Sequence, residues 1–222
     1  MVDIMHKVSK IQITDRLDGI KDKLTLSDKR PKGRVQVFEK RDDGKLEKIE
    51  DTSNLIVYQG REWLLQRALN VNSPGWDTDA PDWIISWFGL GTGGAGANLL
   101  IPLVPDVTDT DLTQPAIINA TDPTLANSGK LHPFDSIDVL EDTSNDNRRL
   151  IASISTTISQ ADANGPDGTT YYDLNEAGLY VSNSIVPGSV LTDSITMFAR
   201  VTFSTIRKNS SRSLVFLWYI YF

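Results

Sequence analysis

Hydrophobic and polar residues alternate most clearly in the last third of the chain, where the pattern predicts β-strands. In residues 150–158 one parity reads Leu, Ala, Ile, Thr, Ile, which is typical of a strand with one buried face. Residues 170–183 and 194–206 are predicted as two further strands, and residues 213–222 as a fourth. Residues 207–212 form a short polar connection, so we expect the last two strands to pair as a hairpin.

The final predicted strand is apolar on both faces. Trp218 and Phe222 lie on one parity, and Tyr219 and Tyr221 lie on the other. A strand that buries both faces belongs at the centre of a layered structure or at a subunit interface. Exposing it would cost several kcal/mol, at about 25 cal/mol per Å² of apolar surface. We therefore predict that these four residues are core or interface anchors.

Earlier in the chain, the pattern predicts a hairpin, a helix and another buried strand. Residues 34–50 alternate around a turn that contains Asp-Asp-Gly, which is typical of a β-hairpin. Residues 60–70 have helical spacing of apolar positions and end at an asparagine. Residues 83–90 are rich in tryptophan and isoleucine, so we predict a buried strand with Trp83 and Trp87 as further core or interface anchors.

These elements predict a mainly β protein, an antiparallel β-sandwich or jelly-roll-like fold with one short α-helix. Residues 1–33 are expected to form an extended N-terminal arm, and residues 34–222 a single domain. Residues 91–147 are rich in proline and aspartate and read as a long insertion in that domain. Because structureless loops of this length are unusual, we expect short edge strands within it, such as residues 116–119.

Composition excludes several classes of site. The chain has 222 residues, no cysteine and two histidines, which rules out disulfides, thiol catalysis and cysteine-ligated zinc. We expect neither a metal nor a cofactor. No apolar run approaches the roughly 18 residues that span a bilayer, and the N-terminus lacks the pattern of a secretion signal. We therefore expect no membrane association and a product that is cytoplasmic when made.

Charge is divided unevenly along the chain. Residues 1–50 hold 13 Lys/Arg and 10 Asp/Glu, whereas residues 51–222 hold 9 and 19, so the formal charges are +3 and −10. The acidic body should repel nucleic acid. The simpler interpretation of this division is that the basic N-terminal arm is solvated. The more specific interpretation is that the arm docks on an acidic neighbour, which includes another copy of the same chain. Lys21, Lys23 and Arg61 are candidate rim contacts.

Two motifs are typical of ligand sites, one for a dinucleotide and one for a cation, but the surrounding sequence argues against both sites. Residues 89–94 match GxGxxG after a predicted strand, but the following prolines cannot support the helix that a dinucleotide site requires. We interpret them as a glycine-rich turn. Asp106, Asp109 and Asp111 offer oxygen ligands for a cation such as calcium, but Asx turns explain their spacing without a metal.

No set of residues predicts an enzyme. Glu176 lies within a predicted strand, and general acid–base catalysis would require a positioned partner. We expect Glu176 to meet a cation across the sheet instead, with Arg200 as the candidate. Neither histidine accompanies a nucleophile in a recognisable arrangement.

Four segments, taken in order, resemble a family of tailed-bacteriophage virion proteins. They are residues 54–65 (NLIVYQGREWLL), 88–93 (FGLGTG), 175–180 (NEAGLY) and 197–208 (MFARVTFSTIRK), followed by the apolar C-terminal strand. The resemblance covers about residues 52–95 and 148–222 and implies no catalytic residues.

The resemblance implies a structural protein of the virion, assembled in the host cytoplasm. We expect a homo-oligomeric scaffold at the neck/collar or at the baseplate/tail-fibre attachment, whose partners are other copies and other virion proteins. The alternative is a receptor- or carbohydrate-binding module of a tail fibre, in which Trp76, Trp83 and Trp87 stack on sugar rings.

Overall fold

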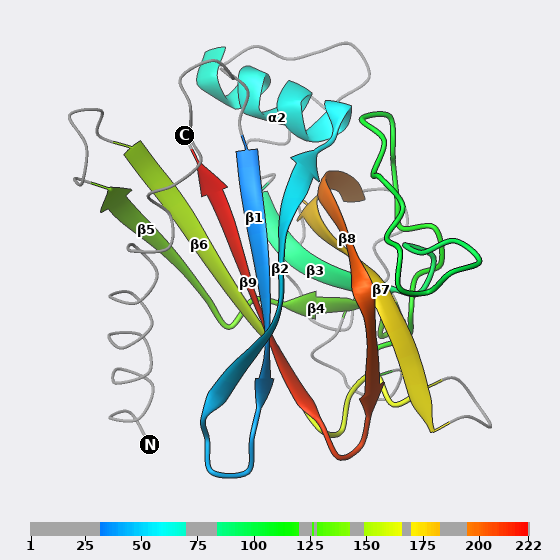
Figure 1. The fold of residues 1–222 in the computed structure, drawn as a ribbon. Helices are drawn as coiled ribbons and strands as arrows, with labels where there is room; N and C mark the ends of the chain where they lie inside the picture. Colours follow the sequence, from blue (N-terminus) through cyan, green and yellow to red (C-terminus); the bar gives the residue numbers. More distant parts are fainter. Residues whose placement is uncertain are drawn as a thin grey trace.

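The computed structural model describes residues 32–69, 84–119, 126, 128–142, 149–165, 170–182 and 195–221, which are mainly antiparallel β-strands (Figure 1). The helix described is α2 (Tyr58–Leu69). The strands are β1 (Lys32–Lys40), β2 (Leu46–Ile56), β3 (Ile84–Gly91), β4 (Leu131–Pro133), β5 (Ser136–Asp142), β6 (Arg149–Ile158), β7 (Tyr171–Ser182), β8 (Ile195–Asn209) and β9 (Ser213–Tyr221).

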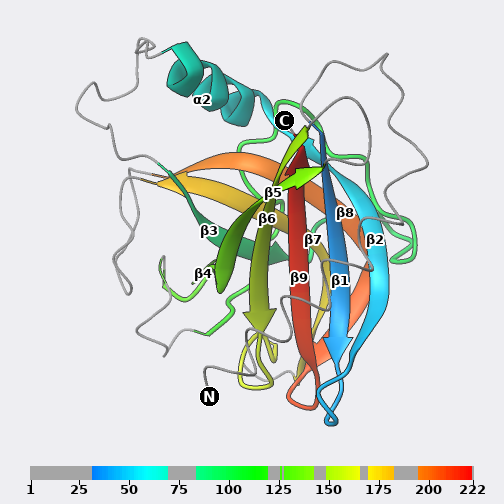
Figure 2. The same cartoon turned by 90° about the vertical axis from the view of Figure 1, so that its left-hand side faces the viewer.

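These strands form one nine-stranded sheet in the order β4-β3-β7-β8-β2-β1-β9-β6-β5. The sheet curls so that β1, β9 and β6 lie opposite β3, β7 and β8 (Figure 2). The prediction of a mainly β, antiparallel protein with one short helix is therefore confirmed. Two separate sheets, as in a clear sandwich or jelly roll, do not form. Strand β2 pairs with β1 along most of its length and then with β8 at Leu55 and Ile56, which joins the two halves.

The main core lies inside the curl. Its buried side chains come from both halves, with Phe88 of β3 and Phe216 of β9 in contact at 4.9 Å between ring centroids. Alternate residues of β9, including Trp218, point into this core, and Trp218 is 1% exposed. The other parity, including Tyr219, packs in a second buried cluster with Ile151 of β6. The two apolar faces of β9 are thus buried within the single chain.

The predicted hairpin of the last two strands is wrong. β8 pairs with β7 and β2, whereas β9 pairs with β1 and β6, so consecutive strands lie in opposite halves of the curled sheet. A turn at Asn209–Arg212, closed by the Arg212 N–H donating to the Asn209 carbonyl, carries the chain between the halves. The alternation of residues defined each strand correctly, but it carries no information about which neighbour a strand pairs with.

Helix α2 covers one end of the core and packs on β8 (Figure 1). Trp63 meets Phe198 edge-to-face at 5.8 Å between ring centroids. A side chain at Gly60 would lie 2.0 Å from the Phe198 carbonyl oxygen, so only glycine allows this close approach. The prediction of a helix over residues 60–70 is confirmed, with its start two residues earlier, at Tyr58.

The long insertion supplies both edges of the sheet. β4 and β5 lie within it and occupy the two ends of the strand order. Short edge strands were expected there, but residues 116–119 do not form one. Pro115 instead makes an isolated bridge with Gly91, and the Ala116 N–H donates to the Leu90 carbonyl. The predicted arm, apart from Lys32 and Gly33 at the start of β1, lies outside the described residues.

We predict that Trp218→Ala lowers the free energy of unfolding by about 3–5 kcal/mol, because it leaves a large cavity in a core filled from both halves of the sheet. Tyr58→Ala, at a side chain that is mostly exposed, should change it by less than about 0.5 kcal/mol. Urea unfolding with an unchanged slope provides the measurement. Equal midpoint shifts for the two variants would contradict the position of Trp218 in the core.

Candidate functional site

Glu176 of β7 is a completely buried carboxylate that holds two loops in place. Its Oε1 accepts hydrogen bonds from the backbone N–H groups of Gly93 at 3.0 Å and Gln114 at 2.9 Å. Its Oε2 accepts from the N–H of Thr113 at 3.1 Å and from Arg200 at 2.6 Å. Because a buried charge is costly without partners, these four bonds make the burial of Glu176 tolerable.

Arg200 of β8 completes this cluster. One terminal nitrogen donates to both Glu176 and Thr113 Oγ1, and the other donates to Asp109 Oδ2 at 2.6 Å. Burial lowers the pKa of Arg200, but the hydrogen bond that Arg200 donates to Asp109 and the charge of Glu176 outweigh this effect and raise the pKa overall. The predicted Glu176–Arg200 pair across the sheet is confirmed. We call Glu176, Arg200, Asp109 and Asn175, with the loop backbone that they bind, the Glu176–Arg200 cluster.

The glycine-rich turn after β3 packs against this cluster. The N–H of Gly94 donates to Asn175 Oδ1 at 2.6 Å. A Cβ atom at Gly91 would lie 2.5 Å from Glu176 Oε1, and one at Gly94 would lie 2.2 Å from the Asn175 carbonyl oxygen. The glycines therefore allow the backbone to approach β7, and the N–H groups of Gly93 and Gly94 donate to side chains of the same protein.

Four of the segments that carry the sequence resemblance meet at this point, whereas the C-terminal strand lies in the other half of the sheet. Residues 88–93 and 175–180 contribute the turn and the carboxylate, and residues 197–208 contribute Arg200. Residues 54–65 enter through β2, where Leu55 is the strand partner of Arg200. These four segments of the chain thus meet at one structural junction.

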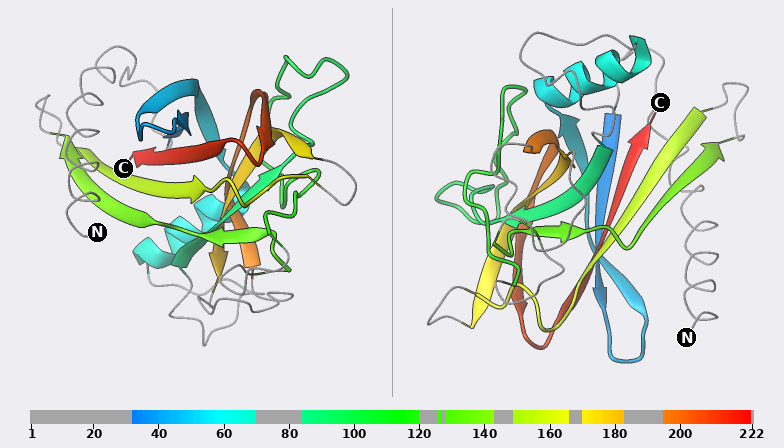
Figure 3. Two further views of the ribbon diagram at one scale, coloured as in Figure 1. Left: turned by 90° about the horizontal axis from the view of Figure 1, so that it is seen from below. Right: turned by 180° about the vertical axis from the view of Figure 1, so that it is seen from behind.

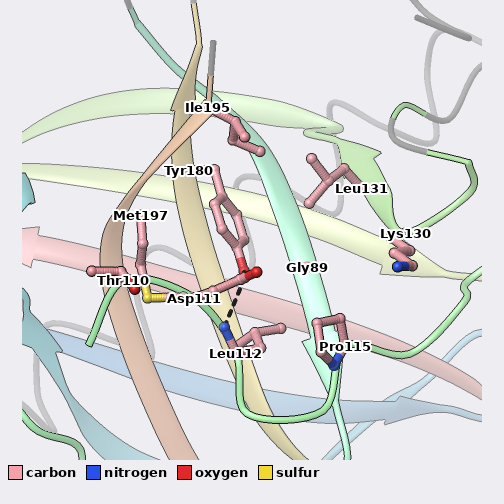
Figure 4. Close-up of a pocket in the computed structure, with 10 residues that line it drawn as sticks. All are labelled: Gly89, Thr110, Asp111, Leu112, Pro115, Lys130, Leu131, Tyr180, Ile195 and Met197. Atoms are coloured by element: carbon pink, nitrogen blue, oxygen red, sulfur yellow. Dashed lines mark hydrogen bonds between the residues drawn. The ribbon is translucent and has the colours of Figure 1, made fainter. Parts of the chain in front are cut away.

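A small cavity of about 150 Å³ lies beside this junction (Figure 4). Its lining includes Asp111, Lys130 and Tyr180, together with apolar side chains such as Met197. The Tyr180 hydroxyl donates to Asp111 Oδ1 at 2.6 Å. Burial and the neighbouring Asp111 charge raise the pKa of Tyr180, so it stays a neutral donor. The cavity is smaller than the roughly 300–1,000 Å³ of ordinary ligand sites, and two of its polar groups, Tyr180 and Asp111, already pair with each other.

Lys208 is a buried cation that the sequence pattern did not reveal. Its Nζ donates to the carbonyl oxygens of Asp162 at 2.6 Å and Asn209 at 2.9 Å, and to Asn164 Oδ1 at 3.0 Å. It fixes the loop after β6, where Ala163 has a positive φ of 50°. Burial lowers the pKa of Lys208 to about 8. Its neighbour Arg207 is exposed, and nothing in the alternation distinguishes the two.

Residues 99–107 form an apolar loop on the surface. Leu100 is 75% exposed and Val104 is 91% exposed, and four other large apolar side chains of this loop are also exposed. The loop is nevertheless fixed in position: Thr205 donates to the Leu99 carbonyl, and Leu103 N–H donates to the Gly94 carbonyl at 2.8 Å. We call residues 99–107 the apolar loop.

The predicted anchors and rim contacts lie in different environments. Trp87, Trp218 and Tyr219 are buried, and Tyr221 is half-buried. Arg61 is half-buried and donates to the Ile56 carbonyl at 2.9 Å, which ties α2 to the end of β2. The remaining candidates lie outside the described residues: Trp83, Phe222, Lys21 and Lys23.

The aspartates considered for a cation make structural bonds. Asp106 accepts from the N–H and hydroxyl of Thr108, Asp109 binds Arg200, and Asp111 accepts from Tyr180. Among the described residues, no three histidine or acidic side chains gather into a metal-binding group. The described helix is too short to cross a membrane.

Comparisons with known proteins place the chain in no family. No family model matches it, and neither does any curated protein or any solved structure. Functional interpretation therefore depends on the geometry of the described residues and on the motif resemblance.

We predict that Glu176→Gln lowers the free energy of unfolding by about 3–5 kcal/mol, because it removes the fully buried one of the two carboxylates that neutralise Arg200 and leaves only Asp109. Asp173→Asn is the matched control: it lies on the same strand and removes the partner of Arg207, whose side chain is 57% exposed. That pair should contribute less than about 1 kcal/mol. Urea midpoints measure both changes, and a smaller loss for Glu176→Gln than for the control would contradict the anchoring role.

We also predict that stability rises with pH above about 8. Below about pH 8 Lys208 is charged in both the folded and the unfolded chain, so folding bears the full cost of burying the charge. Between about 8 and its ordinary value of 10.5, the folded chain releases the proton while the unfolded chain keeps it, so stability increases by roughly 1–3 kcal/mol. Lys208→Met should abolish this rise, and Lys48→Met, at an exposed residue, should retain it. Parallel pH profiles of wild type and Lys208→Met in urea unfolding would refute the assignment.

Proposed function

We propose that this chain is a structural component of a tailed-phage virion, a homo-oligomeric scaffold at the neck/collar or baseplate/tail-fibre attachment. It acts by protein–protein packing and without catalysis. In this proposal the curled sheet serves as a sandwich-like rigid body, whose two halves enclose one core. The observation that carries the proposal is the apolar loop, which presents large apolar side chains to solvent on a fixed backbone.

Exposed apolar side chains in one contiguous loop favour a protein contact. Single exposed leucines are ordinary, but a concentrated apolar patch is typical of an interaction surface. In the apolar loop, Leu100, Ile101 and Val104 are each more than 60% exposed. Burying them against a partner would contribute favourably at about 25 cal/mol per Å².

The loop is also pre-organised for such a contact. Thr202 donates to the Leu103 carbonyl, and Thr205 donates to the Leu99 carbonyl from both its backbone and its side chain. The N–H of Tyr58, at the start of α2, donates to the Val107 carbonyl at 2.7 Å. Because the loop is already ordered, binding would cost little conformational entropy.

The chemistry of the Glu176–Arg200 cluster supports packing over catalysis. Glu176 has no exposed surface, and its oxygens are occupied by four donors from the same chain. A catalytic acid would need access to a substrate and a change of partners during the reaction. The motifs that resemble virion proteins therefore serve here to fix loops, which is what a scaffold requires.

The carbohydrate-binding alternative loses one of its three tryptophans. Trp87 is 1% exposed and lies in a buried cluster with Tyr180 and Met197, so it cannot stack on a sugar ring. Trp76 and Trp83 lie outside the described residues. No described residue favours this function over assembly.

We predict that purified tailed-phage virions contain this chain. The double substitution Leu100→Ser/Val104→Ser should lower the amount of the chain per virion about tenfold or more. Loss of two interface anchors should cost more than the roughly 1.4 kcal/mol that corresponds to a tenfold change. Asp42→Ser, in the exposed β1–β2 turn, is the control and should be incorporated normally.

The measurement is quantitative mass spectrometry of particles grown with each variant as the sole source of the chain. Absence of the wild-type chain from particles, or specific binding of the isolated protein to glycans, would contradict the proposed function. Normal incorporation of the double variant would show that the apolar loop is not the contact.

A further inference from the structure

Strand β5 is the last strand of the described sheet, and its outer side is a candidate site for strand addition. It lies at the margin of the sheet in opposite views (Figure 1, Figure 3). β6 is its neighbour on one side, and on the other side Ser136–Leu140 have no strand partner among the described residues. An unpaired edge of this length is a ready template for strand addition, which proteins usually prevent with a bulge, a proline or a covering segment.

The side chains of this edge are apolar on the face that continues the core. Ile137 is 53% exposed and Val139 is 72% exposed. Their partners on β6 are Ile154, which is buried in the main core, and Ala152, which packs against it. Because directly paired residues share one face of a sheet, Ile137 and Val139 extend the core-facing surface beyond its covered part. One more strand would give them neighbours.

The charge of the edge indicates what kind of strand would fit. Residues 135–140 (DSIDVL) contain two acidic residues and no lysine or arginine. A second acidic strand would be repelled, so the partner should alternate apolar and cationic positions. The sequence outside the described residues contains an apolar, positively charged segment near its start: residues 4–14 (IMHKVSKIQIT), which carry two lysines and no acidic residue. Within it, Ile11 and Ile13 share one parity and Lys10 has the other.

We propose that residues 4–14 of a second copy of this chain add to the free edge of β5, so that the copies exchange their N-terminal segments. Val8, Ile11 and Ile13 are β-branched, which favours a strand. An antiparallel register that sets Ile11 opposite Val139 and Ile13 opposite Ile137 continues the apolar face. The same register places Lys10 on the face that Asp138 occupies.

The remaining chain is long enough for exchange. Residues 15–31 separate this segment from β1, and extended chain spans up to about 3.3 Å per residue, or roughly 55 Å in total. Strand addition from a neighbouring copy is a known route to symmetric assemblies with little new surface. The proposal rests on the proposed homo-oligomeric scaffold and names the contact that builds it, whereas the apolar loop would bind other virion proteins.

Two full-length variants test the exchange. Val139→Lys places a charge on the edge, and Ile11→Asp/Ile13→Asp makes the donor segment acidic. Wild type should self-associate in sedimentation velocity, and each variant alone should be monomeric. Val104→Lys is the matched control: it makes the same change at a highly exposed valine of the apolar loop and should associate like wild type.

Mixing the two variants distinguishes exchange between copies from pairing within one copy. Val139→Lys retains an intact donor segment, and Ile11→Asp/Ile13→Asp retains an intact edge, so the mixture should form a one-to-one heterodimer. A mixture that stays monomeric, a monomeric wild type, or association lost in Val104→Lys and kept in Val139→Lys would overturn the proposal. Particle incorporation, measured separately, would still decide the scaffold function.

Discussion

A carboxylate without access to water organises the most irregular part of this protein. Glu176 lies in the centre of β7, and its burial is tolerable only because the glycine-rich turn, the Asp109–Gln114 loop and Arg200 all bring donors to it. This requirement determines the path of the chain after β3. The turn must approach β7 so closely that side chains at Gly91 and Gly94 would collide with it. The apolar loop connects the glycine-rich turn to the Asp109–Gln114 loop, and because both of these segments are fixed, its side chains are held towards solvent.

This constraint links the fold to the proposed assembly role. A long insertion rich in proline and aspartate would ordinarily be an unreliable binding surface, because ordering it on contact costs conformational entropy. Here the entropy cost is met during folding, when Glu176 binds the loop backbone and Arg200 binds the side chains of Asp109 and Thr113. The surface features left over are an ordered apolar loop and an acidic strand edge, which suit contacts with two different kinds of neighbour.

Local pattern predicted the elements well and their pairing poorly. Alternation located β1, β6, β7 and β9, and helical spacing located α2, because these signals depend on each segment alone. The β8–β9 hairpin was predicted from a short polar connection, but β1 and β2 lie between these strands in the sheet. Pairing partners are decided by the curl of the whole sheet, which no local pattern records.

In the candidate site, too, some contacts were predicted from the sequence and others were not. The Glu176–Arg200 pair was predicted because a lone charge in each of two strands needs a partner. The role of the glycines was missed, because GxGxxG has the same spacing whether its N–H groups face a phosphate or a carboxylate of the protein itself. Lys208 was missed because its burial depends on the loop after β6, which is remote in sequence.

Native-state hydrogen exchange of the wild-type protein tests the anchoring claim most directly. The account predicts that the amides of Gly93, Thr113 and Gln114, although they lie in loops, exchange only through global unfolding, as slowly as the amides of β7. Exchange of these three amides at the rate of exposed loop amides, such as that of Val104, would show that Glu176 does not hold the loops and would contradict the account.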